Sequence, residues 1–218
     1  MFKIIIIPET NALTQAEFDT LLPLVSPEKQ MRIKQFRLFC DAQNALLGDI
    51  LVRTEICHAT GLYNKQLEFS TNDYGKPFLI NNPYIHYNIS HTGSYVSCAI
   101  SDKVVGIDIE LIKPVDLEIA ERYFAADEAA YIKNNRQLYR FFEVWTKKES
   151  RVKWDGKGLS IPLSSFSVFD PLELKVLTYH AVIHTNEVIC HACSSKRERP
   201  QVRTIDTATL IQQYAKVA

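Results

Sequence analysis

The sequence of 218 residues has no net charge, few glycines and no long apolar run. Its 25 basic residues balance 25 acidic ones, so an anion would have to be held by a local cluster rather than by bulk charge. The apolar stretch that follows Lys3 ends at Pro8 and is too short for a secretion signal. No window is long enough to cross a bilayer. We therefore expect a cytoplasmic protein that acts on neither nucleic acid nor membranes.

The five cysteines are odd in number and scattered, which predicts reduced thiols rather than a disulfide framework. Cys190 and Cys193, with histidines nearby, superficially resemble zinc ligands. Strand alternation would place these two cysteines on opposite faces, so we interpret them as ordinary strand residues. Ser90 and His91 would likewise point in opposite directions on a strand and could not form a nucleophile–base pair by themselves.

The order of predicted elements indicates an α+β fold. Proline after Ser26 marks a helix start, and helical spacing continues to about His58. A second helical region is expected from about Asp116 to Trp154. Strand-like runs are expected at residues 1–8, 67–70, 85–90, 95–100 and 104–109, and again at 166–169, 174–183, 187–192 and 202–205. The two halves repeat loosely, so a cleft between them is the first place to look for a site.

The first candidate site residues are Asp108 and Glu110. They lie two apart on a predicted strand, so both carboxylates share one face while Ile107 and Ile109 face the core. Two adjacent carboxylates repel each other unless a cation or a proton lies between them, and hard oxygen ligands suit Mg²⁺. An exposed strand face with incidental acids is the alternative interpretation.

The second candidate group lies on the helix expected at 142–153. Trp145, Glu149 and Lys153 are four residues apart and share one face. Glu149 could be a third metal ligand, with flanking lysines for phosphate. Alternatively, Glu149 and Lys153 form a surface helix pair that contributes only about 0.3 kcal/mol.

The two segments together form a specific pattern. Residues 106–110 read G-I-D-I-E, and residues 145–153 read W-T-K-K-E-S-R-V-K. In this order the pair resembles the signature of the 4'-phosphopantetheinyl transferase superfamily. The likeness extends to the Sfp-type branch through residues 26–29, 46–53, 74–77, 87–93, 156–159 and 165–168.

The resemblance implies two similar α+β halves, at residues 1–104 and 105–218, that form an intramolecular pseudo-dimer. Each half would have a small antiparallel sheet and a long helix, and the active site would lie in the cleft between them. The implied reaction transfers 4'-phosphopantetheine from coenzyme A to a serine of an apo acyl or peptidyl carrier protein, with Mg²⁺, and releases 3',5'-ADP. A monomer is expected.

The resemblance also implies residue roles. Asp108, Glu110 and Glu149 would hold the metal, and Lys153 would contact the pyrophosphate and stabilise the leaving group. Glu149 or Glu128 would take the serine proton. The coenzyme A phosphates would be bound by Lys29, Arg32, Lys76, Ser90 and His91.

The residues themselves support an anion site at the first of these positions. Four basic residues and no acids lie between Lys29 and Arg37, and Lys29 shares a helix face with Arg32. A solvated basic helix face is the alternative. The sequence departs from the branch at Asn44-Ala45, where an arginine and a hydroxyl residue are usual. Because Ala45 cannot donate a hydrogen bond to the 3'-phosphate, we expect altered coenzyme A affinity but retained activity.

Two other functions remain open at this point. A relative that binds coenzyme A or a carrier without catalysis would lack the intact acids and lysine. A metal-dependent phosphatase or pyrophosphatase would use the same acids but would need no carrier. The sequence does not indicate which carriers are modified.

Overall fold

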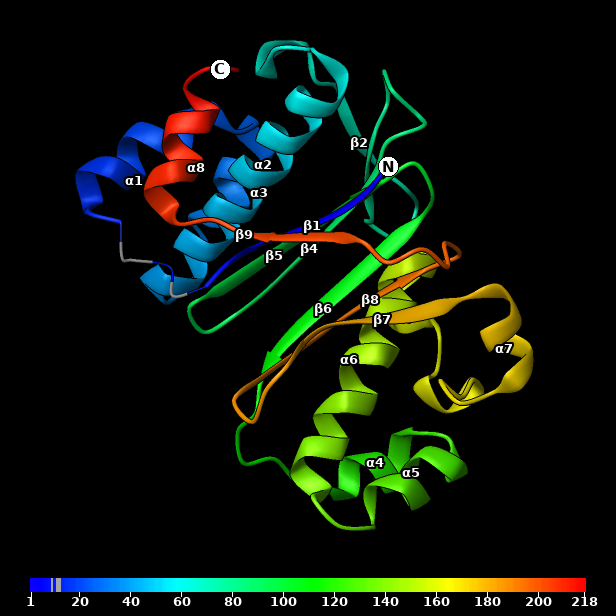
Figure 1. The fold of residues 1–218 in the computed structure, drawn as a ribbon. Coiled ribbons are helices and arrows are strands. Elements are labelled where there is room, and N and C mark those ends of the chain that lie inside the picture. Colours follow the sequence, from blue (N-terminus) through cyan, green and yellow to red (C-terminus); the bar gives the residue numbers. More distant parts are fainter. Residues whose placement is uncertain (9, 11–12) are drawn as a thin grey trace.

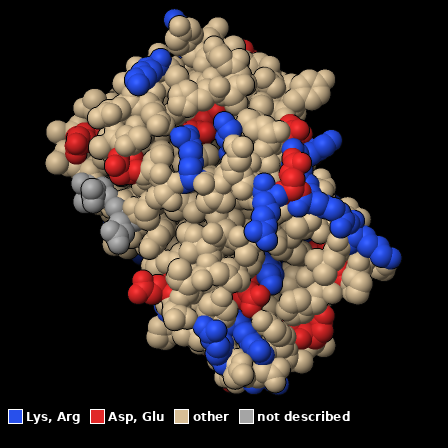
Figure 2. Space-filling model, viewed as in Figure 1, with Lys and Arg blue, Asp and Glu red and all other residues tan. Residues whose placement is uncertain are grey.

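The structure, a computed structural model, describes residues 1–8, 10 and 13–218 and has a mixed α+β fold. Figure 1 shows two small sheets near the centre, with helices on their outer sides. On the face seen in Figure 2, basic and acidic side chains are interspersed, in keeping with the zero net charge. Within the described residues, no helix combines the length and apolar character needed to cross a bilayer.

The first sheet has the strand order β4-β5-β1-β9. Strand β1 is antiparallel to β5 and parallel to β9. The strands are β1 (Phe2–Ile7), β4 (His86–Thr92), β5 (Tyr95–Ser101) and β9 (Gln201–Thr204).

The second sheet is antiparallel, with the order β6-β8-β7. Its strands are β6 (Val105–Leu111), β7 (Thr178–His184) and β8 (Val188–Ser194). A separate two-stranded hairpin pairs β2 (Phe69–Thr71) with β3 (Pro77–Leu79).

Alternation along β1 explains how the layers stack. Ile5 and Ile7 belong to the core beneath the long helix α3 (Phe39–Thr60), whereas Ile4 and Ile6 pack against the second sheet. The second sheet places its other face against the long helix α6 (Gln137–Asp155). The two sheets therefore share a buried apolar layer, and each long helix covers an outer face.

Both long helices end at a glycine in the left-handed conformation, Gly61 (φ 75°) and Gly156 (φ 83°). The other α-helices are α1 (Gln15–Leu21), α2 (Pro27–Ile33), α4 (Glu118–Tyr123), α5 (Ala126–Ile132), α7 (Pro171–Val176) and α8 (Thr207–Tyr214). Short 3₁₀ turns occupy Leu22–Leu24, Asn64–Gln66, Gly158–Ser160 and Leu163–Ser165.

Two predicted strands are wrong or partly wrong. Residues 166–169 form no strand but a loop that follows a 3₁₀ turn. The run at 174–183 begins as helix α7, because the Asp170 side chain accepts the Leu172 N–H at 2.8 Å and Pro171 starts the helix. Only its second part becomes strand β7.

The C-terminal segment returns to the first half of the molecule. Strand β9 pairs with β1, and α8 packs on α3. The Tyr214 hydroxyl donates to the Leu24 carbonyl at 3.1 Å. The chain is therefore not divided strictly into two halves at residue 104, because its C-terminal segment packs on the first half. The boundary does coincide with the change from the first sheet, which contains β5, to the second, which contains β6.

Candidate active site

Side chains of β4 join the two sheets along the edge of β6. The Asn88 side-chain oxygen accepts the Ile107 N–H at 2.8 Å, and the Ser90 hydroxyl accepts the Ile109 N–H at 3.4 Å. These two β4 side chains lie two residues apart and so share one face of the strand. We call this boundary, which consists of strands β4 and β6, the β4–β6 seam.

Asp108 lies at the centre of the seam and is 4% exposed. Its Oδ1 accepts hydrogen bonds from Lys153 Nζ at 2.6 Å and from the Ser90 hydroxyl at 3.0 Å. Lys153 Nζ also donates to the Ser90 hydroxyl at 2.8 Å. The other carboxylate oxygen, Oδ2, is buried and has no hydrogen-bond partner among the described residues. A buried unpaired carboxylate oxygen needs either a ligand or a proton.

The three predicted acidic ligands share one electrostatic environment. Burial raises the pKa of Asp108, against the opposing effect of Lys153. Burial is also the largest cause of the raised pKa of Glu110 and of Glu149, and in both the Asp108 charge is the second cause. A cation among the three carboxylates would offset both effects.

The residues present fit a hard divalent cation. Asp108 Oδ2 is available, Glu110 and Glu149 supply further oxygens, and such ligands suit Mg²⁺. Within the described part of the chain, no three His, Cys, Asp or Glu side chains already converge on one metal position. The unpaired oxygen is therefore the observation that supports a metal here.

Gly106 determines how closely helix α6 approaches β6. A Cβ atom at this position would lie 2.0 Å from the Ser150 carbonyl oxygen and 2.4 Å from the Trp154 backbone nitrogen. Only a residue without a side chain fits such a contact. The close approach brings Lys153 of the helix onto Asp108 of the strand. The predicted strand and helix positions of these residues are confirmed.

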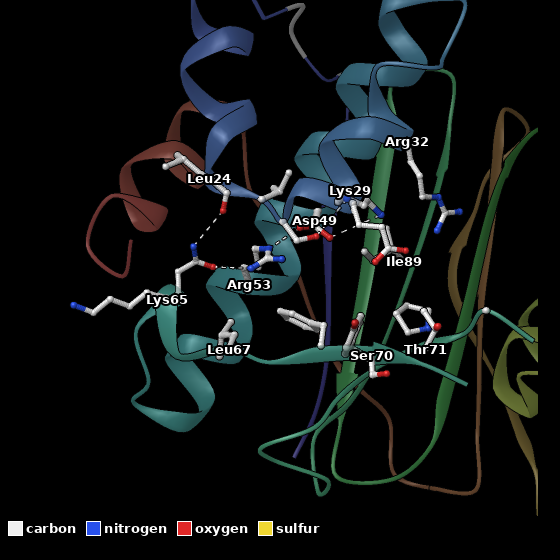
Figure 3. A pocket seen from close by; sticks show the side chains of 18 residues that line it. Leu24, Lys29, Arg32, Asp49, Arg53, Lys65, Leu67, Ser70, Thr71 and Ile89 are labelled. Carbon is white, nitrogen blue, oxygen red and sulfur yellow. Dashed lines mark hydrogen bonds and ion pairs between the residues drawn. The ribbon is translucent and has the colours of Figure 1, made fainter. Parts of the chain in front are cut away.

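A groove lies between α2, α3 and the β2–β3 hairpin (Figure 3). It consists of a pocket of about 510 Å³ and a second of about 280 Å³ that share Lys29, Arg32 and four other lining residues. The smaller pocket also includes His91 and Ala45. Ser26 caps helix α2 by accepting the Lys29 N–H at 3.3 Å. Two cations on one helical turn thus face a space large enough for part of a nucleotide.

Ser90 and His91 face different parts of the site, as alternation predicts. Ser90 contacts Asp108, whereas His91 lines the smaller pocket. Burial and the nearby Lys153 charge lower the pKa of His91. His91 therefore lies between the groove and the seam.

The structure does not bring Lys76 to the groove cations. Its ammonium donates to the carbonyls of Trp154 at 3.0 Å and Val105 at 3.5 Å, and it lines a separate pocket of about 200 Å³. Burial lowers its pKa to about 8. Lys76 thus links the hairpin loop to the end of α6. Its neighbours Gly75 and Pro77 are the residues of this motif that line the groove.

Glu128 also lies outside the site. It is 0% exposed and forms an ion pair with Lys148 at 2.7 Å, and its carboxylate accepts the backbone N–H groups of Ala125 and Val168. An incoming serine cannot reach a carboxylate that is enclosed and fully hydrogen-bonded. The sequence could not show this, because an acid on a helix is usually exposed.

Sequence reasoning assigned no role to Asn88 and Thr92, which the structure places in the seam. Thr92 donates to Glu110 at 3.1 Å, and Asn88 binds the β6 backbone. Alternation from Ser90 was the signal that could have identified both. Asn44 and Ala45 stand where the Sfp-type branch usually has an arginine and a hydroxyl residue. Ala45 lines the groove, and the buried Asn44 side chain donates to the Gly93 carbonyl at 2.6 Å.

Comparisons with known proteins show the family of this chain. Residues 12–103 match the family described as 4'-phosphopantetheinyl transferase, N-terminal, and residues 104–213 match the 4'-phosphopantetheinyl transferase superfamily. The chain is 43% identical to 4'-phosphopantetheinyl transferase Sfp of Bacillus subtilis (strain 168), over 72% of this chain and 71% of that protein. It is 41% identical to 4'-phosphopantetheinyl transferase psf-1 of Bacillus pumilus, over 77% and 73% of the two chains. The chain belongs to the 4'-phosphopantetheinyl transferase superfamily.

Proposed function

We propose that this protein transfers 4'-phosphopantetheine from coenzyme A to a serine of an apo acyl or peptidyl carrier protein. The observation that carries the proposal is Asp108, whose Oδ1 is bound by Lys153 while its buried Oδ2 has no partner among the described residues. Family membership supports the reaction class.

In this proposal Asp108, Glu110 and Glu149 would hold Mg²⁺ at the coenzyme A pyrophosphate. The bound cation supplies charge neutralisation and orientation of the phosphates. Lys29, Arg32 and His91, which line the groove, bind the 3'-phosphate in this proposal.

The residues of the chain then carry the other steps. The serine oxygen forms a bond to the β-phosphorus, and the bond from that phosphorus to the oxygen of 3',5'-ADP breaks. Glu149 receives the serine proton. Lys153 stabilises the charge that develops on the leaving phosphate. Glu128 has no part in this scheme because it is enclosed.

We also propose that the chain is an internal pseudo-dimer that acts as a monomer in the cytoplasm. The pairing of one small sheet with one long helix in each half, α3 with the first sheet and α6 with the second, supports an internal pseudo-dimer that acts as a monomer. The cysteines are free thiols, which supports a reducing cytoplasmic location.

The direct test is intact-mass spectrometry of a purified apo peptidyl carrier protein incubated with this protein, coenzyme A and Mg²⁺. A mass gain of one phosphopantetheine that requires both enzyme and Mg²⁺ is expected. Coenzyme A breakdown without carrier modification would instead support the phosphatase alternative. Coenzyme A binding without either reaction would support the non-catalytic one.

Asp108→Ala tests the residue assignment. We expect transfer to fall by at least about 100-fold, since Lys153 and the metal both lose their shared ligand. Asp19→Asn on the exposed surface of α1 is the matched control and should leave transfer unchanged. A near-normal rate for folded Asp108→Ala would remove this residue from the site.

A further inference from the structure

Two acidic residues line the groove that we assign to phosphates, the exposed Glu28 and the more buried Asp49. Asp49 of α3 lines the larger pocket, and its side chain is 17% exposed. The reaction scheme gives it no role, and by charge alone a carboxylate at this position should repel a phosphate. Its contacts give a different explanation.

Asp49 belongs to a series of contacts that runs along the helical side of the pocket (Figure 3). Arg53 Nε donates to Asp49 Oδ2 at 2.6 Å, and Lys29 Nζ lies 3.8 Å from Asp49 Oδ1. Arg53 also donates to the Asn64 side-chain oxygen at 3.0 Å. Asn64 in turn donates to the carbonyl of Leu24, shortly before helix α2, at 3.2 Å.

The two cations that contact Asp49 differ in how firmly they are held. The Arg53 side chain is 8% exposed, and its guanidinium lies 4.7 Å from the centre of the Phe69 ring. Asp49 is therefore bound to a fixed cation. Lys29 is 32% exposed, and at 3.8 Å it makes an ion pair but no direct hydrogen bond with Asp49. The ammonium is thus attracted toward the groove while its three donors stay available.

We propose that Asp49 is a positioning residue for Lys29 and thereby determines selectivity for substrates that carry a phosphomonoester, here the 3'-phosphate of coenzyme A. The inference rests on the proposed function. The larger pocket is lined by the cations of Lys29, Arg32, Arg53 and Lys65 and by the carboxylates of Glu28 and Asp49, which together leave a net charge of +2. This matches a phosphomonoester with a charge of about −1.5 to −2 near pH 7.

The replacement Asp49→Asn separates positioning from simple charge. If the carboxylate acted only by its charge, its removal would strengthen phosphate binding and lower KM for coenzyme A. If it positions Lys29, the same change frees a flexible side chain and raises KM. The two explanations predict opposite signs for one measurement.

The experiment compares coenzyme A with 3'-dephospho-coenzyme A as substrates of the full-length protein and an apo carrier. For Asp49→Asn we expect the ratio of the two kcat/KM values to fall about tenfold, a fraction of what complete loss of a charged hydrogen bond would cause. The change should lie in KM for coenzyme A, with kcat and the 3'-dephospho substrate within about twofold of wild type. A purely structural defect would affect both substrates equally.

Two further variants complete the test. Asp19→Asn removes the same charge from the surface of α1 and should leave the ratio unchanged. Arg53→Lys keeps the charge but removes the planar donor group, and should lower the ratio by a smaller factor. Because both substrates are measured on one preparation, the ratio does not depend on the folded fraction.

An unchanged or increased ratio in Asp49→Asn would overturn the inference while leaving the proposed function intact. If Asp49→Asn cannot be purified, an unchanged ratio in Arg53→Lys would overturn it as well. Failure of the wild-type protein to modify any carrier would instead contradict the proposed function.

Discussion

Replacement of Gly106 by alanine tests how the site is assembled. The new Cβ would lie 2.0 Å from the Ser150 carbonyl oxygen, whereas ordinary van der Waals contact begins near 3.4 Å. The obstructing atoms belong to the backbone of α6, so no side-chain rotation can relieve the clash. To restore ordinary contact, helix and strand must separate by roughly 1.4 Å (3.4 Å less 2.0 Å) at Gly106, which lies two residues before Asp108.

The expected effect on stability follows from overpacking. Insertion of a methyl group into a close backbone contact costs about 3 kcal/mol, the upper part of the usual range. For a chain of this length that corresponds to a decrease in Tm of about 6–12 °C. Activity should fall further, because the 2.6 Å contact between Lys153 and Asp108 spans the same interface. A displacement of about 1 Å at a reacting centre lowers the rate by about 100-fold.

The measurements are a thermal melt and a carrier-modification assay normalised to folded protein. Gly61→Ala is the matched control, because Gly61 has φ 75° but no atom within 4 Å of its added Cβ. It should lose about 1–2 kcal/mol through backbone strain and keep full activity per folded molecule. Wild-type Tm and turnover in Gly106→Ala would refute the proposed spacing of β6 and α6.

The remaining predictions concern the buried ion pair of Glu128 with Lys148 and the partly buried ammonium of Lys76. Glu128→Gln should lower the free energy of unfolding by about 3–5 kcal/mol, because Lys148 loses its buried partner. Urea unfolding should show recovery in the double variant Glu128→Leu/Lys148→Met, and lost turnover with unchanged stability would restore a catalytic role to Glu128. The pKa of Lys76 is lowered to about 8 from 10.5, so between these pH values the unfolded chain binds more protons. Wild-type stability relative to Lys76→Met should therefore rise by on the order of 2 kcal/mol from pH 7 to pH 10. KM for coenzyme A should not change in Lys76→Met, and a large increase would place its ammonium on the substrate.

The sequence predicted local elements where one pattern dominates. Strand β6 alternates Ile107 and Ile109 with two acids, and the helix with Glu149 and Lys153 shows the expected spacing, so both positions are confirmed. The secondary structure of residues 174–183 was harder to predict, because their apolar residues recur without a clear helical or strand period. There the cap at Asp170 and Pro171 determines a helix that the composition does not indicate.

Burial and long-range pairing explain what the sequence could not show. Glu128 is an acid on a short helix, and only the tertiary structure reveals that it is enclosed with Lys148. Strand β9 pairs with β1 nearly two hundred residues away, and no local pattern encodes such a partner. Lys76 belongs to a recognisable motif, yet its ammonium binds backbone carbonyls of the other half.

Ser90 shows that a sequence motif can identify a site residue without showing which groups its side chain binds. A hydroxyl has one donor and two acceptor lone pairs. Ser90 donates to Asp108 and accepts from Lys153 and from the Ile109 N–H, so all three are occupied within the seam. A phosphate oxygen could accept the Ser90 O–H only by displacing Asp108, a group that the proposed reaction needs. The Ser90 hydroxyl is therefore better explained as a group that orients the Asp108 carboxylate and the Lys153 ammonium. His91, on the opposite face of β4, lines the pocket and remains available to the ligand.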